Sequence, residues 1–87
     1  MSSIPELDIP AARRRIAGLA ARTPLTHSIS LSERSGVPVY LKLETTQPTT
    51  AFKVRGASSK VMALSDEERS RGVVTASTGN HGRGVAY

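Results

Sequence analysis

The sequence has 87 residues, enough for one small domain, and contains no cysteine, which excludes a disulfide framework and a thiolate metal site. Its formal net charge of +5 first suggests a nucleic-acid binder, but the basic residues are scattered and the three aromatic residues form no stacking platform. The run at residues 13–15 fits the solvated face of a helix better, so we expect no nucleic-acid partner.

Residues 1–20 lack the continuous apolar run of a signal peptide or a membrane span, because charged residues interrupt it. His27 and His81 are too few and too far apart in the sequence for a metal cluster. The expectation is therefore a soluble cytoplasmic protein without a metal and without a membrane partner.

In chain order, a loose flexible arm is expected over residues 1–9, followed by a helix that Pro10 opens and residues 22–24 end. The next predicted elements are an extended piece at 25–28, a helical turn at 31–34, a strand within 37–43, a polar loop at 45–50 and a helix at 52–64. Ser65 and Glu68 form a capping box that starts another helix. The last predicted elements are a short apolar strand at 73–76, a turn at 79–82 and a helix from 83 onward.

The alternation of strands and helices predicts an α/β fold with a partial, mostly parallel sheet and crossover helices. Right-handed connections would make the strands at 39–43 and 73–76 run the same way. Ligands of such sheets bind beyond the carboxyl ends of the strands, where the loops at 44–53 and 77–82 would emerge.

The first loop places Lys53 at the opening of a helix, with Phe52 as an apolar wall beside it. A lysine amine can form a Schiff base with an aldehyde, although most lysines are solvated surface residues. The second loop, Ser-Thr-Gly-Asn-His-Gly at 77–82, could bind an anion at a helix start, or could be an ordinary capped turn.

The two loops taken together indicate a protein family far more specifically than either loop alone. Residues 41–57, LKLETTQPTTAFKVRGA, resemble the cofactor-lysine segment of the serine/threonine dehydratase and serine racemase family. Residues 77–82 resemble its substrate-carboxylate loop, and Thr-Pro-Leu at 23–25 resembles its usual N-terminal motif. The resemblance runs from about residue 10 to the end, and it implies the tryptophan-synthase-β-like fold of pyridoxal-phosphate enzymes.

The resemblance also implies residue roles. Lys53 would bind pyridoxal phosphate covalently and act as catalytic base, Phe52 would flank the cofactor ring, and Asn80 would hydrogen-bond the phenolic oxygen. The pocket for the substrate carboxylate would be lined by Ser77, Thr78, Asn80 and His81. Lys42 and Arg55 match positions near the site without an assigned role.

Three positions depart from the family pattern. Thr50-Ala51 replaces the usual Gly-Ser. At the position of Thr78, racemases carry a serine and many dehydratases carry an alanine. Thr78 keeps a hydroxyl that could serve as a second acid/base group, but its methyl group crowds that hydroxyl. Gly82-Arg83 replaces Ala-Gln or Gly-Gln and most resembles the branch linked to hydroxyectoine breakdown.

The family's phosphate-binding loop lies beyond residue 87, so residues 1–87 are expected to be an incomplete N-terminal segment that is inactive alone. The complete protein, expected to be a homo-oligomer, would eliminate water and ammonia from a hydroxy amino acid such as L-threonine or L-serine, yielding a 2-oxo acid. The alternatives are a racemase, a synthase of the same fold, or a non-catalytic anion- or nucleotide-binding module. Synthases usually carry aspartate where Val54 stands, which favours a dehydratase or racemase.

Overall fold

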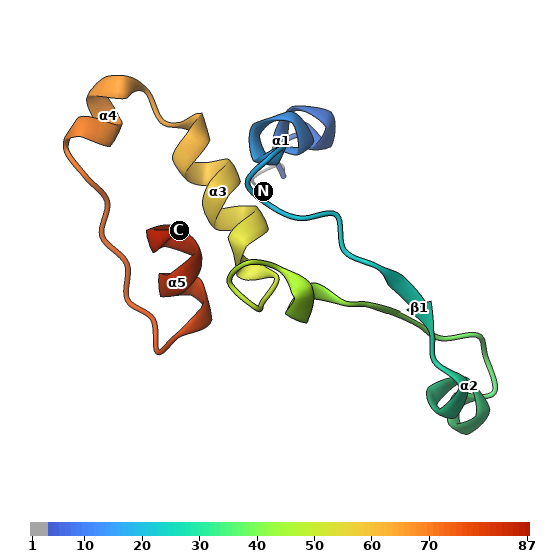
Figure 1. The fold of residues 1–87 in the computed structure, drawn as a ribbon. Helices are drawn as coiled ribbons and strands as arrows, with labels where there is room; N and C mark the ends of the chain where they lie inside the picture. The colour runs from blue at the N-terminus through green and yellow to red at the C-terminus, as the bar shows by residue number, and fades with distance from the viewer. Residues whose placement is uncertain (1–3) are drawn as a thin grey trace.

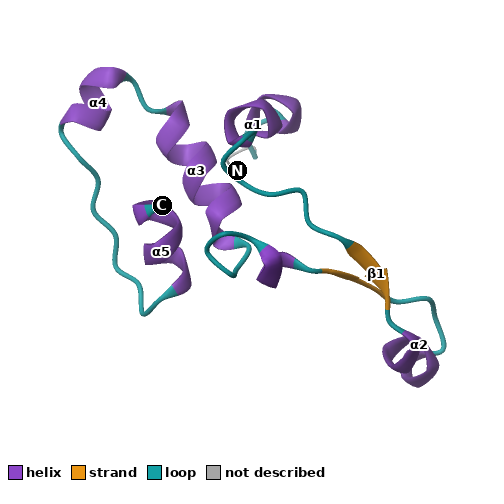
Figure 2. Ribbon diagram, viewed as in Figure 1, coloured by secondary structure: helices purple, strands orange, loops and turns teal. Residues whose placement is uncertain are grey.

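The computed structural model describes residues 4–87 (Figure 1). Short helices dominate these residues, and Figure 2 shows one small strand pair at a distance from the three helices of the core. The helices are α1 (Ile9–Ile16), α2 (Ile29–Ser35), α3 (Lys53–Ala63), α4 (Asp66–Ser70) and α5 (Asn80–Ala86); the strands are β1 (Leu25–His27) and β2 (Tyr40–Lys42), and a 3-10 turn, η1, spans Glu44–Thr46.

Local capping interactions begin several of these helices. The Asp8 carboxylate accepts a hydrogen bond from the Ala11 N–H, so α1 starts one residue before Pro10. In the predicted capping box, the Glu68 N–H donates to the Ser65 hydroxyl at 3.1 Å and the Ser65 N–H donates to the Glu68 carboxylate at 2.8 Å. The predicted helix at 52–64 is confirmed as α3, and the last helix starts at Asn80, three residues earlier than expected.

The arm predicted for residues 1–9 is tested only in part, because residues 1–3 lie outside the described residues. Residues 4–8 belong to no helix or strand and are exposed, whereas Ile9 already belongs to α1. α1 also ends earlier than expected, at Ile16, and Gly18 follows with a φ of 82°.

The strand pairing differs from the prediction. β1 and β2 pair antiparallel, with Thr26 opposite Leu41. The predicted strand at 73–76 is wrong for this structure: these residues are extended but unpaired and exposed, and Val74 is fully exposed. A strand is defined by its hydrogen-bonded neighbour, and no strand between residues 4 and 87 lies beside this segment. The small α/β unit is therefore observed, and a mostly parallel sheet remains a proposal for the complete protein.

The core lies where α3 packs between α1 and α5 (Figure 1). Val54 and Ala57 of α3 are its buried apolar residues, at 0% and 4% exposure. The strand pair and α2 extend away from this core, and the radius of gyration is 16.3 Å, against roughly 12 Å for a compact domain of this length. The part of the chain that can position a site is thus the helix trio around α3.

Candidate active site

Lys53 is the first residue of α3 and Phe52 occupies the capping position before it. Both side chains are exposed, and the Lys53 Nζ lies 5.1 Å from the centroid of the Phe52 ring. The backbone at Phe52 is already helical, at φ −72° and ψ −15°, so the turn holds both residues at the same end of the helix. This geometry confirms the predicted placement of the lysine at a helix opening.

In the segment before α3, the backbone of Thr50 adopts a strained conformation. Its φ is +63°, in the left-handed region that β-branched residues rarely adopt. The Thr50 hydroxyl donates to the Thr49 carbonyl at 2.7 Å, and Thr49 is buried. The departure from the family's Gly-Ser pattern thus falls on a position whose conformation suits glycine.

The second loop leads into α5. The Ser77 hydroxyl accepts a hydrogen bond from the Gly79 N–H at 3.1 Å, and Thr78 lies exposed between them. Asn80 and His81 are the first two residues of α5 and are exposed as well. The four residues predicted to line the substrate pocket therefore form one continuous exposed turn.

The two loops meet where α5 packs against α3. A β-carbon on Gly84 would lie 3.2 Å from the Lys53 carbonyl carbon and oxygen and from the Val54 nitrogen. The Arg83 guanidinium donates a long hydrogen bond, 3.4 Å, to the Thr50 hydroxyl. Within residues 4–87, no hydrogen bond joins the Lys53 side chain to the 77–81 turn. The segment around Lys53 is therefore joined to α5 by backbone packing at Gly84 and by the Arg83–Thr50 hydrogen bond.

Arg55, one of the unassigned positions, forms an ion pair with Glu44. Its Nε and Nη2 donate to the two Glu44 carboxylate oxygens at 2.8 and 2.9 Å. The Thr23 hydroxyl donates to the same carboxylate at 2.5 Å, and Gln47 Nε2 at 3.1 Å. The hydrogen bonds from Arg55, with smaller contributions from Thr23 and Gln47, outweigh burial and lower the pKa of Glu44 to about 2. The same pair raises the pKa of Arg55.

Sequence reasoning missed Gly84 and the Glu44 cluster. The short spacing of Gly82 and Gly84 in α5 was an available signal for close helix packing. Glu44 offered a weaker signal: it is an acidic residue that follows a predicted strand, and its ion-pair partner, Arg55, lies eleven residues further along the sequence. Neither residue belongs to the exposed turn: Gly84 contacts the Lys53 backbone, and Glu44 contacts Arg55.

The exposed amine fits a cofactor that carries an aldehyde. The Lys53 Nζ lies beside an aromatic face, and Asn80 and His81 begin α5, the helix whose Gly84 packs against the Lys53 carbonyl. The amine can condense with an aldehyde, and the neighbouring phenyl ring can stack on a pyridine ring. The residues present therefore fit pyridoxal phosphate.

Several known enzymes are similar to this chain in sequence or in structure. The L-threonine ammonia-lyase of Thermotoga maritima is 52% identical over 79 residues, which cover 91% of this chain and 20% of that enzyme. The serine racemase of Dictyostelium discoideum is 39% identical over 87 residues, which cover 100% of this chain and 27% of that protein. The solved structure of maize serine racemase matches with a TM-score of 0.77 at 45% identity, covering 91% of this chain and 26% of that one.

The chain thus spans about a quarter or less of the length of these relatives. The sequence pattern of the family described as pyridoxal-phosphate dependent enzyme matches residues 16–87, most of the chain. The predicted resemblance is confirmed: the chain belongs to the family of pyridoxal-phosphate dependent enzymes.

Proposed function

We propose that these residues form part of an enzyme that deaminates a hydroxy amino acid, such as L-threonine or L-serine, to a 2-oxo acid and ammonia. The observation that carries the proposal is the position of Lys53, exposed at the opening of α3 with its backbone against α5. The name of the Thermotoga relative, an L-threonine ammonia-lyase, supports the reaction type.

The proposed roles follow from this arrangement. Lys53 holds the cofactor and moves the proton of the substrate α-carbon through its Nζ, with Phe52 flanking the ring and Asn80 hydrogen-bonding it. Pyridoxal phosphate, when bound, stores the electron pair that the α-carbon keeps on losing that proton. The substrate carboxylate is oriented by the exposed turn of Ser77, Thr78, Asn80 and His81.

A racemase is the second candidate, because two relatives at 39% and 45% identity are serine racemases. A synthase is disfavoured, because synthases of this fold usually carry aspartate at the position where this chain has the buried Val54. We further propose that the complete protein is a homo-oligomer located in the cytoplasm. Its substrate could also be a compound of hydroxyectoine breakdown. No helix among residues 4–87 is long and apolar enough to cross a membrane.

The test is Lys53→Ala in the complete enzyme, with Lys60→Ala as control, since Lys60 is exposed on the same helix. We expect Lys53→Ala to lose both the visible absorbance of bound cofactor and 2-oxo acid formation, and Lys60→Ala to keep both. Retained absorbance in Lys53→Ala would place the cofactor on another lysine. Absence of cofactor absorbance in the unaltered protein would favour the non-catalytic binding module.

A further inference from the structure

The Glu44 carboxylate accepts four hydrogen bonds from three side chains that belong to separate segments. Two come from Arg55 in the first turn of α3, one from Thr23 ahead of β1 and one from Gln47 after η1. Thr23 and Gln47 are 6% and 2% exposed, and the Glu44 side chain is 15% exposed. The Glu44 carboxylate is therefore largely shielded from water, whereas the Arg55 side chain that it binds remains 35% exposed.

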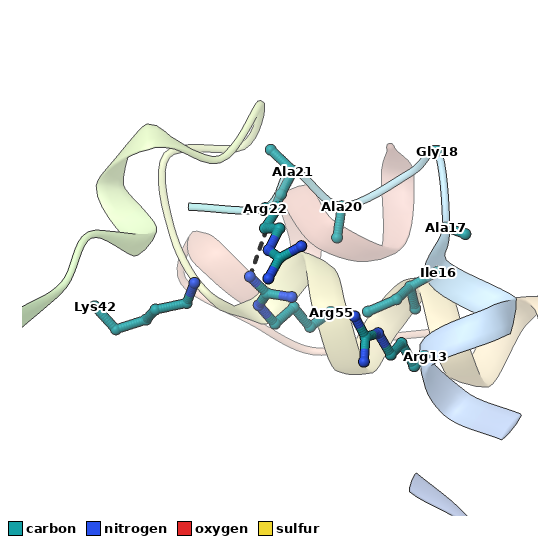
Figure 3. Close-up of a pocket in the computed structure, with 9 residues that line it drawn as sticks. All are labelled: Arg13, Ile16, Ala17, Gly18, Ala20, Ala21, Arg22, Lys42 and Arg55. Atoms are coloured by element: carbon teal, nitrogen blue, oxygen red, sulfur yellow. Dashed lines mark hydrogen bonds between the residues drawn. The ribbon is translucent and has the colours of Figure 1, made fainter. Parts of the chain in front are cut away.

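Backbone contacts tie the same cluster to the segment that follows α1. Gln47 Nε2 donates to the Ala21 carbonyl at 2.8 Å, and the Ala21 N–H donates to Gln47 Oε1 at 2.7 Å. Arg55 Nη2 donates to the same carbonyl at 3.1 Å, the dashed contact in Figure 3. The start of α3 is thus held from two directions by groups distant in sequence.

Glu44 also balances a local excess of positive charge. Arg55 lines a cavity of about 360 Å³ together with three further cations, Arg13, Arg22 and Lys42 (Figure 3). Phe52, Lys53 and Asn80 do not line this cavity, which lies on the α1 side of α3. Without the Glu44 charge, Arg55 would keep its hydrogen bond to the Ala21 carbonyl but would lose its anionic partner beside three further cations.

We propose that Glu44 is a positioning residue for Lys53: through Arg55 it fixes the first turn of α3, and thereby the direction in which the Lys53 amine leaves the helix. Arg55 follows Lys53 by two residues, in the same helical turn, so a rotation of that turn moves both side chains together. The close packing of Gly84 on the Lys53 carbonyl restrains the other side of the turn. This inference rests on the proposed role of Lys53.

The experiment measures how fast Lys53 in the cofactor-free complete enzyme reacts with added pyridoxal phosphate. The product is trapped by borohydride reduction and located by peptide mass spectrometry, at a temperature where circular dichroism shows every variant to be folded. The test variant is Glu44→Gln, which removes the charge and keeps the shape. Asp66→Asn is the matched control, because Asp66 forms an exposed ion pair with Arg69.

We expect Glu44→Gln to slow labelling of Lys53 by about tenfold or more, and Asp66→Asn to leave the rate unchanged. If Glu44→Gln does not fold, Thr23→Val removes one hydrogen bond, leaves the ion pair, and should slow labelling about threefold. A folded variant that labels Lys53 at the unaltered rate overturns the positioning role and leaves the proposed function standing. A label on another lysine in the unaltered protein overturns the proposed function itself.

Discussion

The carbonyl group of Lys53 packs closely against Gly84. A β-carbon at Gly84 would come within 3.2 Å of both the carbon and the oxygen of that carbonyl, closer than backbone atoms ordinarily allow. Glycine lets α5 approach α3 this closely, whereas any β-carbon would push the two backbones apart by a few tenths of an ångström. Lys53, the residue proposed to carry the chemistry, therefore packs directly on the helix that carries the proposed substrate turn.

Gly84→Val should therefore destabilise the complete enzyme by about 1–3 kcal/mol, because the added carbons force α5 away from α3. Gly56→Val is the matched control: Gly56 lies in α3, and a β-carbon there meets nothing within 4 Å. The free energy of unfolding in urea measures both changes. Equal losses in the two variants would mean that the contact between α5 and Lys53 is not close in solution.

Thr50→Gly should raise stability by up to about 1.5 kcal/mol. Glycine relieves the strain of a φ of +63°, roughly 1–2 kcal/mol, and costs about 0.5–1 kcal/mol in chain entropy. Thr45→Gly provides the comparison, because Thr45 is exposed and has no positive φ, so only the entropy cost applies. The measurement is the thermal midpoint of each variant, and a lower midpoint for Thr50→Gly than for Thr45→Gly would refute the strain.

Glu44 should make stability fall at acid pH. Arg55 lowers the Glu44 pKa from 4.5 to about 2, so its contribution is fully present above pH 4.5 and is lost as the pH falls through 2. The difference in unfolding free energy between the unaltered enzyme and Glu44→Gln should be constant above about pH 5 and shrink from pH 4.5 to 2. Urea unfolding across this range checks it, and a difference that stays constant to pH 2 contradicts it.

Thr78 should limit racemization. Its hydroxyl is restricted at χ1 by the methyl group, and an acid/base group must lie within about 3 Å of the proton that it transfers. Thr78→Ser should raise racemization relative to elimination, and Thr78→Ala should remove racemization while sparing elimination. The D-amino acid and the 2-oxo acid are followed together in the three enzymes. Equal D-amino acid from Thr78→Ala and the unaltered enzyme would show that Thr78 is not the second base.

These 87 residues alone should not unfold cooperatively. Among residues 4–87, Val54 is the one large side chain that is fully buried. The side chains of Leu25, Met62 and Val74 are 65%, 45% and 100% exposed. So little burial cannot offset the entropy of ordering the chain. Thermal circular dichroism at low concentration tests this, and a sharp, reversible transition would show that the helix trio is a stable unit by itself.

Much of the local structure could be predicted from the sequence. The capping box of Ser65 and Glu68, the helix after Phe52 and the position of Lys53 at its opening all depend on interactions within about four residues. The family and its cofactor could also be predicted, because the residue pattern around Lys53 and the 77–82 turn is specific. These features are determined locally, so the order of residues is sufficient to find them.

The remaining features were decided only by the tertiary structure. Residues 73–76 have the composition of a strand, but no strand among the described residues lies beside them to pair with. β1 and β2, in contrast, pair with each other in an antiparallel arrangement. The contact of Arg55 with Ala21 joins residues 34 apart, and Gly84 meets Lys53 across two helices. Such contacts depend on how elements pack in three dimensions, and no local pattern of propensity or spacing encodes which distant groups will meet.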